Sequence, residues 1–450
     1  MAIQISSREK DLITVSELLA DLENGRLDTT FDALSGEGGT MAQMERCKNL
    51  VNTFAELYGA DRKVALFTVS GRSELSGNHT DHNHGCVIAA SISLDVLAVA
   101  SPREDGMIRL KSEGFPEDVV DIKSYTVPSE EKYGSSEALI AGVCAGFKKN
   151  GYAVGGFDAV TTSNVLTGSG LSSSAAFEDM IGTIESHLYN HGDVDNVTVS
   201  KIAQYAENVF FGKPCGLMDQ VACAVGGIVA IDFNDPSAPV ITPVPFDMTA
   251  AGYRLCIVNT GGNHADLTGD YAAVPREMKS VAEVFGQAVL RDVDEQAVRD
   301  AIPTLRERVG DRAILRALHF YGENKRVAIQ KDALLSACDT QDPAKRDAAV
   351  KTFFDGVLAS GRSSFCYLQN VYTTANVGEQ GLSLALCLCE SILSGHTAAW
   401  RVHGGGFAGT VQAFVPDHMV ETFANTMDAA FGRGACKVLA IRPVGAARID

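Results

Sequence analysis

The sequence has neither a long hydrophobic run nor an excess of positive charge. No apolar run approaches the roughly 20 residues that cross a bilayer, and residues 1–11 lack the apolar core of a signal peptide. The 38 Lys and Arg residues are outnumbered by 56 Asp and Glu residues, which gives a formal net charge of −18. Such a charge repels nucleic acid and anionic membranes. We therefore expect a cytoplasmic protein that binds neither.

The cysteines lack the arrangement of a disulfide or zinc framework. There are 11 of them, an odd number. Cys387 and Cys389 are separated by one residue, and no second pair follows at zinc-site spacing. We expect free thiols in a reducing compartment.

A glycine- and serine-rich segment, residues 165–176, leads into a helix-forming stretch and reads Val-Leu-Thr-Gly-Ser-Gly-Leu-Ser-Ser-Ser-Ala-Ala. The glycines permit a tight turn, and the free N–H groups of a helix start favour an anion such as phosphate. No Gly-Lys-Ser/Thr follows the glycines, so the segment is not a Walker A loop. Taken alone, it is equally compatible with a phosphate-binding loop and with an ordinary capped turn.

Three other segments accompany this loop. Residues 70–85 read Ser-Gly-Arg-Ser-Glu-Leu-Ser-Gly-Asn-His-Thr-Asp-His-Asn-His-Gly, residues 206–220 read Ala-Glu-Asn-Val-Phe-Phe-Gly-Lys-Pro-Cys-Gly-Leu-Met-Asp-Gln, and residues 402–409 read Val-His-Gly-Gly-Gly-Phe-Ala-Gly. In order and spacing the four segments resemble the motifs of the GHMP kinases, and specifically of the galactokinase family, over about residues 64–445. Residues 70–85 resemble the family pattern Gly-Arg-Val-Asn-Leu-Ile-Gly-Glu-His-Thr-Asp-Tyr-Asn-Gly-Gly. Residues 206–220 resemble the segment that carries the family's catalytic aspartate.

The resemblance implies an α+β protein with the two-domain GHMP kinase fold and an active site between the domains. An N-terminal domain of the ribosomal S5 domain 2-like type is expected over residues 1–249, with a peripheral helical segment over residues 1–60. Pro, Asp and Ser cluster over residues 236–249, which indicates the boundary. A ferredoxin-like domain is expected over residues 250–450. The composition, 46% hydrophobic and 21% charged, is that of a globular protein with a sizeable core.

Hydrophobic periodicity predicts strands and helices along the chain. In the first half we expect helices over 136–148, 175–189 and 200–211, then a loop holding Asp219, and strands over 64–69, 86–94, 96–100, 157–163 and 227–232. In the second half we expect strands over 254–259, 398–415 and 436–443, and mainly helix over 281–369.

Asp219 and Arg72 are the expected catalytic pair. Phosphoryl transfer from ATP mainly requires positioning and neutralisation of charge, and the acceptor hydroxyl needs a group that takes its proton or fixes its orientation. By resemblance Asp219 is that group, and Arg72 pairs with it, lowers its pKa and faces the phosphate. An isolated Asp–Arg pair is more often structural, but the motif context reverses that preference.

The resemblance assigns ATP to the glycine- and serine-rich segment, residues 165–176, called the serine loop below. It assigns Mg²⁺ to two oxygen donors nearby. The expected nucleotide-binding residues are Gly168, Ser169, Gly170, Leu171, Ser172, Ser173, Ser174 and Ala175. Mg²⁺ keeps several waters, so one or two protein ligands suffice, and Ser174 and Glu207 are expected to supply them. The alternative for Glu207 is an exposed helix carboxylate. Ser172 and Ser173 are expected to cap the helix or to touch phosphate, and the turn at 404–409 to support the loop.

The acceptor site is where the sequence departs from the galactokinase pattern. The sugar-binding residues that the resemblance implies are Asn78, His79, Asp81, Gly216 and Tyr271. Asn78 stands where the family has glutamate, which gives up a charge-assisted acceptor worth about 1.5–3 kcal/mol and gains a donor. His82 and His84 replace a tyrosine and a glycine, and residues 261–264 lack an arginine that the family places near the phosphates.

These departures leave three functions open. The first is ATP-dependent phosphorylation of the C1 hydroxyl of galactose. The second is the same reaction on a related sugar, such as galacturonic acid, N-acetylgalactosamine or another C6- or C2-modified hexose, because a site without the glutamate tolerates a substrate anion. The third is a non-catalytic sensor of sugar and ATP, which the retained Arg72, Glu207 and Asp219 disfavour. We expect a monomer or a weak homo-oligomer.

Overall fold

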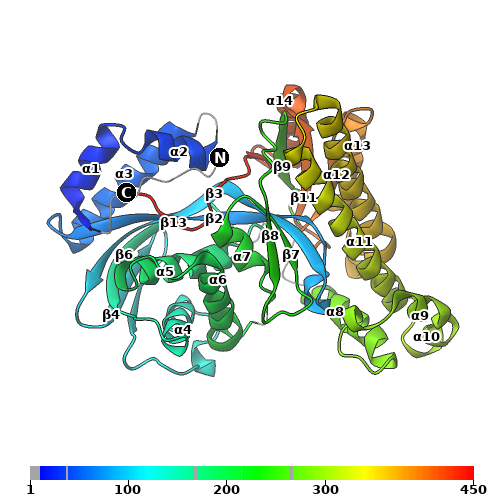
Figure 1. The fold of residues 1–450 in the computed structure, drawn as a ribbon, viewed down its shortest axis with the longest axis horizontal. Coiled ribbons are helices and arrows are strands. Elements are labelled where there is room, and N and C mark those ends of the chain that lie inside the picture. The colour runs from blue at the N-terminus through cyan, green and yellow to red at the C-terminus, as the bar shows by residue number, and fades with distance from the viewer. Residues whose placement is uncertain (1–10, 37–38, 166–169, 214, 263–266) are drawn as a thin grey trace.

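The protein folds into two lobes that lie side by side (Figure 1). The computed structural model describes residues 11–36, 39–165, 170–213, 215–262 and 267–450. A large sheet with helices on both faces forms the first lobe, and a smaller sheet flanked by long helices forms most of the second. Within these ranges no helix is both long and apolar enough to span a bilayer. All 11 cysteines are free thiols, as expected.

Nine described strands form the larger sheet, in the order β1-β2-β3-β6-β4-β5, with β13 paired to β2, β7 to β3 and β8 to β7. They are β1 (Ile13–Thr14), β2 (Lys63–Ser76), β3 (Cys86–Arg103), β4 (Met107–Ser112), β5 (Glu117–Asp121), β6 (Gly156–Ser163), β7 (Ile228–Asp232), β8 (Val240–Val244) and β13 (Ala447–Arg448). β2 is buried along almost its whole length, which is typical of a strand covered on both faces. It continues well beyond the strand expected over 64–69 and carries Arg72.

β3 is a single strand, although the sequence predicts two strands separated at Asp95. The buried carboxylate of Asp95 accepts hydrogen bonds from Arg46 Nη1 at 2.7 Å and from Arg442 Nη1 at 3.0 Å. Because both arginines compensate its charge, Asp95 remains inside a covered strand. The expected break is therefore wrong.

Helices form a layer on each face of this sheet (Figure 1). α1 (Val15–Glu23), α2 (Asp28–Ser35) and α3 (Thr40–Tyr58) cover one face, and α4 (Ser136–Lys149), α5 (Ser173–Tyr189), α6 (Asn196–Tyr205) and α7 (Met218–Val225) cover the other. Phe31 and Phe54 belong to one buried cluster with Leu66 and Val99 of the strands. Within residues 11–36 and 39–60 the N-terminal segment is therefore mainly helical, as expected, but it covers a face of the sheet instead of lying at the periphery.

The smaller sheet is antiparallel, in the order β10-β11-β9-β12. Its strands are β9 (Tyr253–Asn259), β10 (Ala399–His403), β11 (Thr410–Pro416) and β12 (Cys436–Leu439), and the helices of this half are α8 (Thr268–Val284), α9 (Glu295–Asp300), α10 (Ile302–Arg308), α11 (Asp311–Asp339), α12 (Pro343–Ser363), α13 (Gly381–Leu393) and α14 (Val420–Phe431). The first of these strands lies between the third and the fourth, which is the ferredoxin-like arrangement. β12 ends before residue 443, because Ile441 bridges back to Ile92 of β3.

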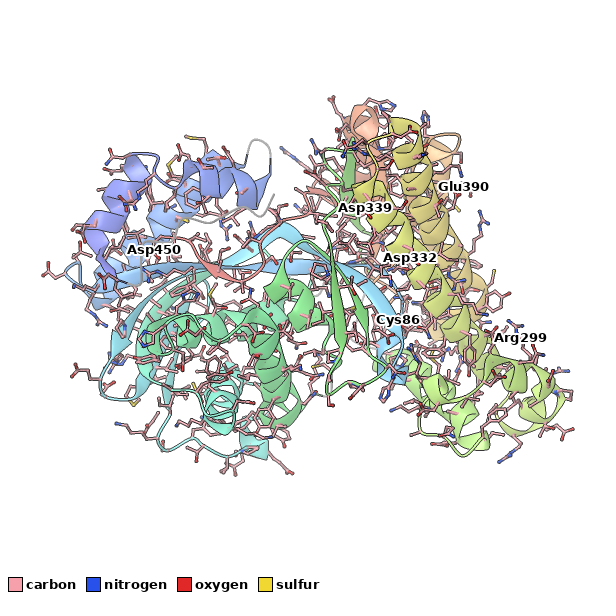
Figure 2. All side chains as sticks on the ribbon, in the orientation of Figure 1. Cys86, Arg299, Asp332, Asp339, Glu390 and Asp450 are labelled. Atoms are coloured by element: carbon pink, nitrogen blue, oxygen red, sulfur yellow. The ribbon has the colours of Figure 1, made fainter. Side chains whose placement is uncertain are left out.

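The end of the chain returns to the first sheet, where β13 pairs with β2. The Asp450 carboxylate accepts a hydrogen bond from the Leu66 N–H at 2.8 Å. Figure 2 shows Asp450 on the first lobe and Cys86, at the start of β3, close to the second. The Cys86 N–H donates to Asn324 Oδ1 of α11 at 2.8 Å. The segment expected to mark the domain boundary, residues 236–249, contains β8, which pairs with β7 of the larger sheet. The division of the two domains between residues 249 and 250 stays a prediction.

Candidate active site

Arg72 and Asp219 form a doubly hydrogen-bonded ion pair. Arg72 lies in β2 beside a shift in the register with β3. Arg72 Nε and Nη2 donate to Asp219 Oδ1 and Oδ2, each at 2.8 Å. Two parallel bonds of this kind fix the geometry of the pair as well as its charge. Asp219 lies in the first turn of α7 and not in the expected loop, because Met218 and Val221 bury one side of that helix.

The serine loop contacts both members of the pair. The Ser172 hydroxyl donates to Asp219 Oδ2 at 2.5 Å, and Arg72 Nη1 donates to the carbonyl of Gly170. The Arg72 N–H also donates to the carbonyl of Leu171 at 3.1 Å. Ser172 has a φ of 59° and makes no side-chain cap bond to α5. The cap role expected for Ser172 is therefore wrong, and its hydroxyl holds the carboxylate instead.

Burial and pairing act on Asp219 in opposite directions. Burial raises the pKa of this carboxyl, but the Arg72 guanidinium and the hydrogen bonds from Arg72 and Ser172 lower it further, so the net pKa lies below its usual value. For Arg72, burial lowers the pKa, and the Asp219 carboxylate raises it by more. Asp219 is therefore ionised near neutral pH and can accept a hydrogen bond from a hydroxyl group.

Glu207 and Ser174, the expected magnesium ligands, lie on two different helical segments. Glu207 is in a π-helical turn, residues 206–211, that follows α6, and its side chain is buried, not exposed. Its Oε1 accepts from Lys213 Nζ and its Oε2 from Gln220 Nε2, both at 2.9 Å. Ser174 is half-buried in the first turn of α5. In the described part of the chain, no three His, Cys, Asp or Glu side chains form a ready metal site.

A second buried carboxylate, Glu178 of α5, shares Gln220 with Glu207. Glu178 Oε2 accepts from Gln220 Nε2 at 3.1 Å, whereas its Oε1 has no partner among the described residues. Burial raises the pKa of Glu178, and the neighbouring Glu207 carboxylate raises it further. Unsatisfied carboxylate oxygens in a buried setting are the hard donors that Mg²⁺ prefers. The donor set around Glu207 therefore fits a magnesium ion.

A cavity of about 590 Å³ opens beside the start of α5. It is lined by Val96, Ser112, Glu113, Phe115, Pro116, Asp118, Ser136, Thr161, Ser163, Val165, Ser173 and Phe177. Its walls combine five apolar residues, among them two aromatic rings and a proline, with seven polar residues, so it can hold a ligand that has both an apolar ring and polar groups. Several lining residues belong to β4, β5 or the turn between them, a hairpin that no sequence pattern indicated, so the cavity was not foreseen either.

The other expected nucleotide-binding residues fall into three sets. Gly168 and Ser169 lie outside the described residues. The side chains of Leu171 and Ala175 are buried in the core, so these two residues have only backbone groups to offer a ligand. Gly170 has a φ of 72°, and a Cβ placed on it would lie 3.5 Å from the Nδ1 atom of His403.

Four of the expected sugar-binding residues form two contact groups, Gly216 with Asp81, and His79 and Tyr271 with the glycine turn after β10. A Cβ on Gly216 would lie 2.3 Å from Asp81 Oδ2, so a larger residue there would displace that carboxylate. Burial, and then the charges of Asp219 and Glu74, raise the pKa of Asp81 to about 6. His79 Nε2 lies 2.9 Å from the carbonyl oxygen of Gly405, and the Tyr271 hydroxyl donates to the carbonyl of Gly406 at 3.0 Å.

Asn78, the fifth, is buried and directs its amide into the protein. Its Nδ2 donates to the carbonyl of Gly404 at 2.7 Å and to Glu74 Oε1 at 3.1 Å, and its Oδ1 accepts from Asn370 Nδ2 at 2.9 Å. Both N–H groups are therefore engaged. The extra donor expected from the change of glutamate to asparagine is not free for a sugar, and only a lone pair on Oδ1 remains.

His403 is a site residue that the sequence interpretation missed. It lies in β10 directly before the glycine turn, and its ring connects Ser73 Oγ, at 3.1 Å, with Thr410 Oγ1, at 2.9 Å. Burial, with the nearby Arg72 and Arg401, lowers its pKa well below the usual value, so the ring is neutral. The only signal in the sequence is its place before Gly404, which by itself does not distinguish it from a packing residue.

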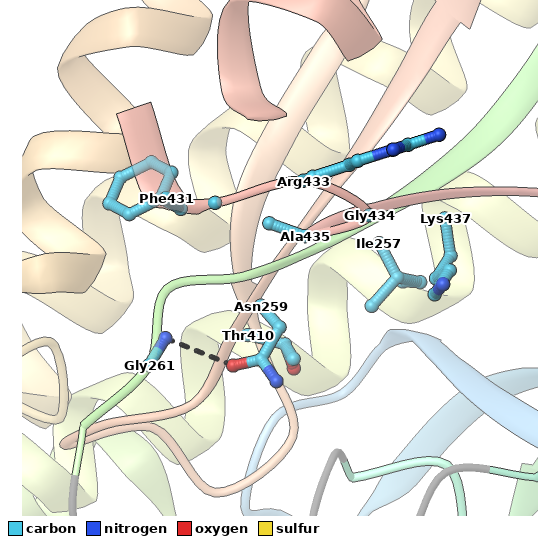
Figure 3. A pocket seen from close by; sticks show the side chains of 10 residues that line it. Ile257, Asn259, Gly261, Thr410, Phe431, Arg433, Gly434, Ala435 and Lys437 are labelled. Atoms are coloured by element: carbon cyan, nitrogen blue, oxygen red, sulfur yellow. Dashed lines mark hydrogen bonds between the residues drawn. The ribbon is translucent and has the colours of Figure 1, made fainter. Parts of the chain in front are cut away.

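A separate cavity of about 290 Å³ lies along β9 and β12 (Figure 3). It is lined by Ile257, Asn259, Gly261, Thr410, Phe431, Gly432, Arg433, Gly434, Ala435 and Lys437. Within it the Gly261 N–H donates to Asn259 Oδ1 at 3.0 Å. Its lining includes none of the residues expected to bind sugar, nucleotide or metal, so we do not assign it to the reaction.

Comparisons with known proteins show which family the chain resembles. Residues 138–227 match the family of GHMP kinases N terminal domains, and residues 52–102 match the galactokinase galactose-binding signature. The galactokinase of Streptomyces coelicolor is 31% identical over 85% of this chain and 92% of its own length. The galactokinase of Actinobacillus pleuropneumoniae serotype 5b is 32% identical over 82% of this chain and 89% of its own length.

Solved structures show the same fold. The galactokinase of Lactococcus lactis complexed with galactose superposes with a TM-score of 0.71 at 24% identity, over 88% of this chain and 98% of that one. The mevalonate kinase of Methanococcus jannaschii gives 0.58 at 12% identity, over 85% and 98%. The two-domain GHMP kinase fold is thereby confirmed. By its motifs, its fold and these relatives, the chain belongs to the galactokinase family of GHMP kinases.

Proposed function

We propose that the protein transfers the γ-phosphoryl group of ATP to the C1 hydroxyl of galactose and releases galactose 1-phosphate and ADP. The observation that carries this function is the Arg72–Asp219 pair, held by Ser172 at the start of α5. A sugar- and ATP-dependent kinase is what the galactokinase relatives indicate. The sensor hypothesis has no comparable support, because a sensor needs no ionised carboxylate bound to an arginine at this place.

The pair supports a mechanism in which Asp219 orients the acceptor hydroxyl. Its lowered pKa makes it a weak base before the phosphate arrives, but a good hydrogen-bond acceptor. Phosphoryl transfer has a loose transition state with little need for early proton removal, so orientation and charge compensation account for most of the catalysis. Arg72 donates hydrogen bonds to both Asp219 and the carbonyl of Gly170. It therefore links the Asp219 carboxylate to the serine loop.

The nucleotide is proposed to lie along the serine loop, with its base in the 590 Å³ cavity. Backbone N–H groups at the start of α5 would receive the phosphates, because a helix N-terminus favours anions. Phe115 and Phe177 line the cavity and offer apolar surface to a purine ring. Ser173 lines the same cavity and is proposed to lie between the base and the phosphates.

Mg²⁺ is proposed to bind at Ser174 and Glu207, with Glu178 close by. When bound, it would neutralise charge on the phosphate oxygens. Lys213, which pairs with Glu207, has a side chain that is 62% exposed, so it can move away when the ion binds.

His79, Asp81, Gly216 and Tyr271 are proposed to bind the sugar, with Asn78 limited to an acceptor contact through Oδ1. The ionised Asp81 carboxylate would accept hydrogen bonds from two neighbouring hydroxyl groups. One observation favours a second acceptor: position 78 carries no charge, so a C6 carboxylate is not repelled there. Galacturonic acid is therefore the alternative substrate. A monomeric or weakly oligomeric state, a cytoplasmic location and the lack of nucleic-acid or membrane partners stay predictions.

A substrate screen tests this function. The purified protein is incubated with ATP, Mg²⁺ and galactose, galacturonic acid, N-acetylgalactosamine or no sugar, and ADP release is followed. Phosphorus NMR of the product then shows whether the new phosphate is anomeric. We expect sugar-dependent ADP release and an anomeric phosphate with galactose. No turnover with any sugar would contradict the proposed function, and turnover with galacturonic acid alone would favour the alternative.

A further inference from the structure

Two of the positions at which residues 70–85 differ from the galactokinase pattern are four residues apart. Glu74 stands opposite the asparagine of that pattern, and Asn78 stands opposite its glutamate. One carboxylate and one amide are thus retained, but their positions are exchanged. In the structure the two side chains touch, with Asn78 Nδ2 3.1 Å from Glu74 Oε1. Because Glu74 and Asn78 share one hydrogen bond, we treat the two differences from the pattern as a single exchange.

Glu74 lies in β2 and its charge is compensated from the second lobe. Arg401 of β10 forms an ion pair with the Glu74 carboxylate, and its Nη2 also donates to the Glu74 carbonyl at 3.0 Å. Both side chains are buried, with relative exposures of 5% and 0%. A buried charge persists only where it is paired and hydrogen-bonded. Glu74 therefore cannot be replaced by a neutral residue without leaving Arg401 unpaired.

Asn78 needs its amide hydrogens where it lies. Its Nδ2 faces two groups that can only accept, the carbonyl of Gly404 and the Glu74 carboxylate, so the orientation of the amide is determined. His319 Nε2 lies 2.9 Å from the Asn78 carbonyl oxygen and fixes the backbone there. A carboxylate at position 78 would face both acceptors and be repelled by each. Each residue of the pair therefore requires the other.

We propose that Glu74 is a positioning residue of the acceptor site and acts together with Asn78 as an exchanged pair. The Glu74–Arg401 ion pair orients the Asn78 amide, and Asn78 holds the Gly404 carbonyl against the end of β2. The next two carbonyl groups of that turn, from Gly405 and Gly406, contact His79 and Tyr271, which face the sugar. By holding the Gly404 carbonyl, the pair fixes the position of the glycine turn, which forms one wall of the proposed sugar site. The kinetic part of this inference rests on the proposed function.

Four proteins test the pair: the wild type, Glu74→Asn, Asn78→Glu and the double exchange, which restores the order of the galactokinase pattern. Each single change leaves either two amides and an unpaired arginine or two adjacent carboxylates. We expect each to lower the melting temperature and to raise the KM for galactose at least about tenfold, with a smaller effect on the KM for ATP. We expect the double exchange to lose less than the sum of the two single changes, because an amide at position 74 removes one of the two acceptors that a carboxylate at position 78 would face.

The exposed pair Gln296 and Asp300 supplies a matched control. It is also an amide and a carboxylate four residues apart, with Gln296 Nε2 donating to Asp300 Oδ1 at 2.8 Å on the surface of α9. Exchange of these two residues should leave the melting temperature and both KM values unchanged. It shows that an amide–carboxylate exchange is harmless where the pair is exposed.

Any one of three results would refute the proposal that Glu74 and Asn78 act together. They are additive losses of melting temperature in the double exchange, an unimpaired Asn78→Glu variant, and equal effects on the KM values of galactose and ATP. If the Asn78→Glu variant does not fold, a double-exchange variant that folds supports the proposal in the same way. A double-exchange variant that also fails to fold refutes the proposal. A wild-type protein that phosphorylates no sugar would refute the proposed function instead. The four melting temperatures would still report whether Glu74 and Asn78 depend on each other.

Discussion

Replacement of Asp219 by asparagine separates the two functions of the Arg72–Asp219 pair. Asparagine retains one acceptor oxygen for Arg72 Nε. Its amide nitrogen cannot accept a hydrogen bond, so Arg72 Nη2 loses its partner. One charge-assisted hydrogen bond is lost, which is worth about 1.5–3 kcal/mol of unfolding free energy. The Asp219 side chain is 34% exposed, so water repairs part of the defect and the lower end of that range is expected.

The effect of Asp219→Asn on activity should be much larger than its effect on stability. An amide cannot hold the acceptor hydroxyl as a charged acceptor, so we expect kcat to fall by roughly 10²–10⁴-fold. ATP affinity measured by calorimetry should stay within about twofold, because the nucleotide contacts lie on the serine loop. Initial rates of ADP release with saturating galactose give kcat, and urea unfolding gives the stability.

Asp311→Asn is the matched control for this variant. Asp311 also accepts two bonds from one guanidinium, Arg306 Nε at 2.7 Å and Nη2 at 3.4 Å, but both side chains are exposed. An exposed pair contributes about 0–1 kcal/mol, so this variant should match the wild type in rate. A kcat for Asp219→Asn within about tenfold of the wild type would refute the orienting role of the carboxylate.

Other changes probe the loop and the acceptor side. Gly170→Val forces a branched side chain onto a φ of 72° next to His403, so ATP binding measured by calorimetry should weaken at least about tenfold, and unchanged binding would remove Gly170 from the nucleotide site. Gly216→Ala should raise the galactose KM but not the ATP KM, because its Cβ displaces the Asp81 carboxylate; equal changes would contradict this. Since the pKa of Asp81 is raised to about 6, its carboxylate is lost as the pH falls through 6, so the galactose KM should rise below pH 6, and Asp81→Asn should abolish that rise. Ser172→Ala removes a hydrogen bond that lowers the pKa of Asp219, so the acidic limb of the kcat profile should move to higher pH; an unmoved limb would mean that the hydroxyl has another role.

The motifs predicted which residues meet, because the chemistry of phosphoryl transfer restricts the choice of side chains. Arg72 and Asp219 are 147 residues apart and still form the expected pair. Apolar runs also placed most strands and helices correctly. The sequence was less informative where a polar residue is buried. The apolar pattern predicts strands over 86–94 and 96–100 but does not reveal that Asp95 lies within one strand, because its two arginine partners come from the distant positions 46 and 442.

The same limit explains the error about Asn78. Its replacement of a glutamate was visible, and a free donor was the natural inference from the amide alone. The acceptors that engage it, Glu74 and the Gly404 carbonyl, become neighbours only when β2 meets the turn after β10. The cavity at β4 and β5 was missed for a related reason. These strands, Met107–Ser112 and Glu117–Asp121, carry many charged residues and alternate too weakly to be distinguished from a loop.

The return of β13 to β2 has a consequence for synthesis of the protein on the ribosome. The hydrogen bond between Asp450 and Leu66 joins residues that are 384 positions apart, so β2 leaves the exit tunnel long before β13, which pairs with its residues Phe67 and Thr68, is made. At about 5–20 residues per second, this interval lasts roughly 20–80 seconds. During it, the backbone groups of β2 that later pair with β13 are unpaired and can pair with other chains. The first lobe therefore cannot be completed before the second lobe has been translated, and nascent chains are most exposed to aggregation in that interval.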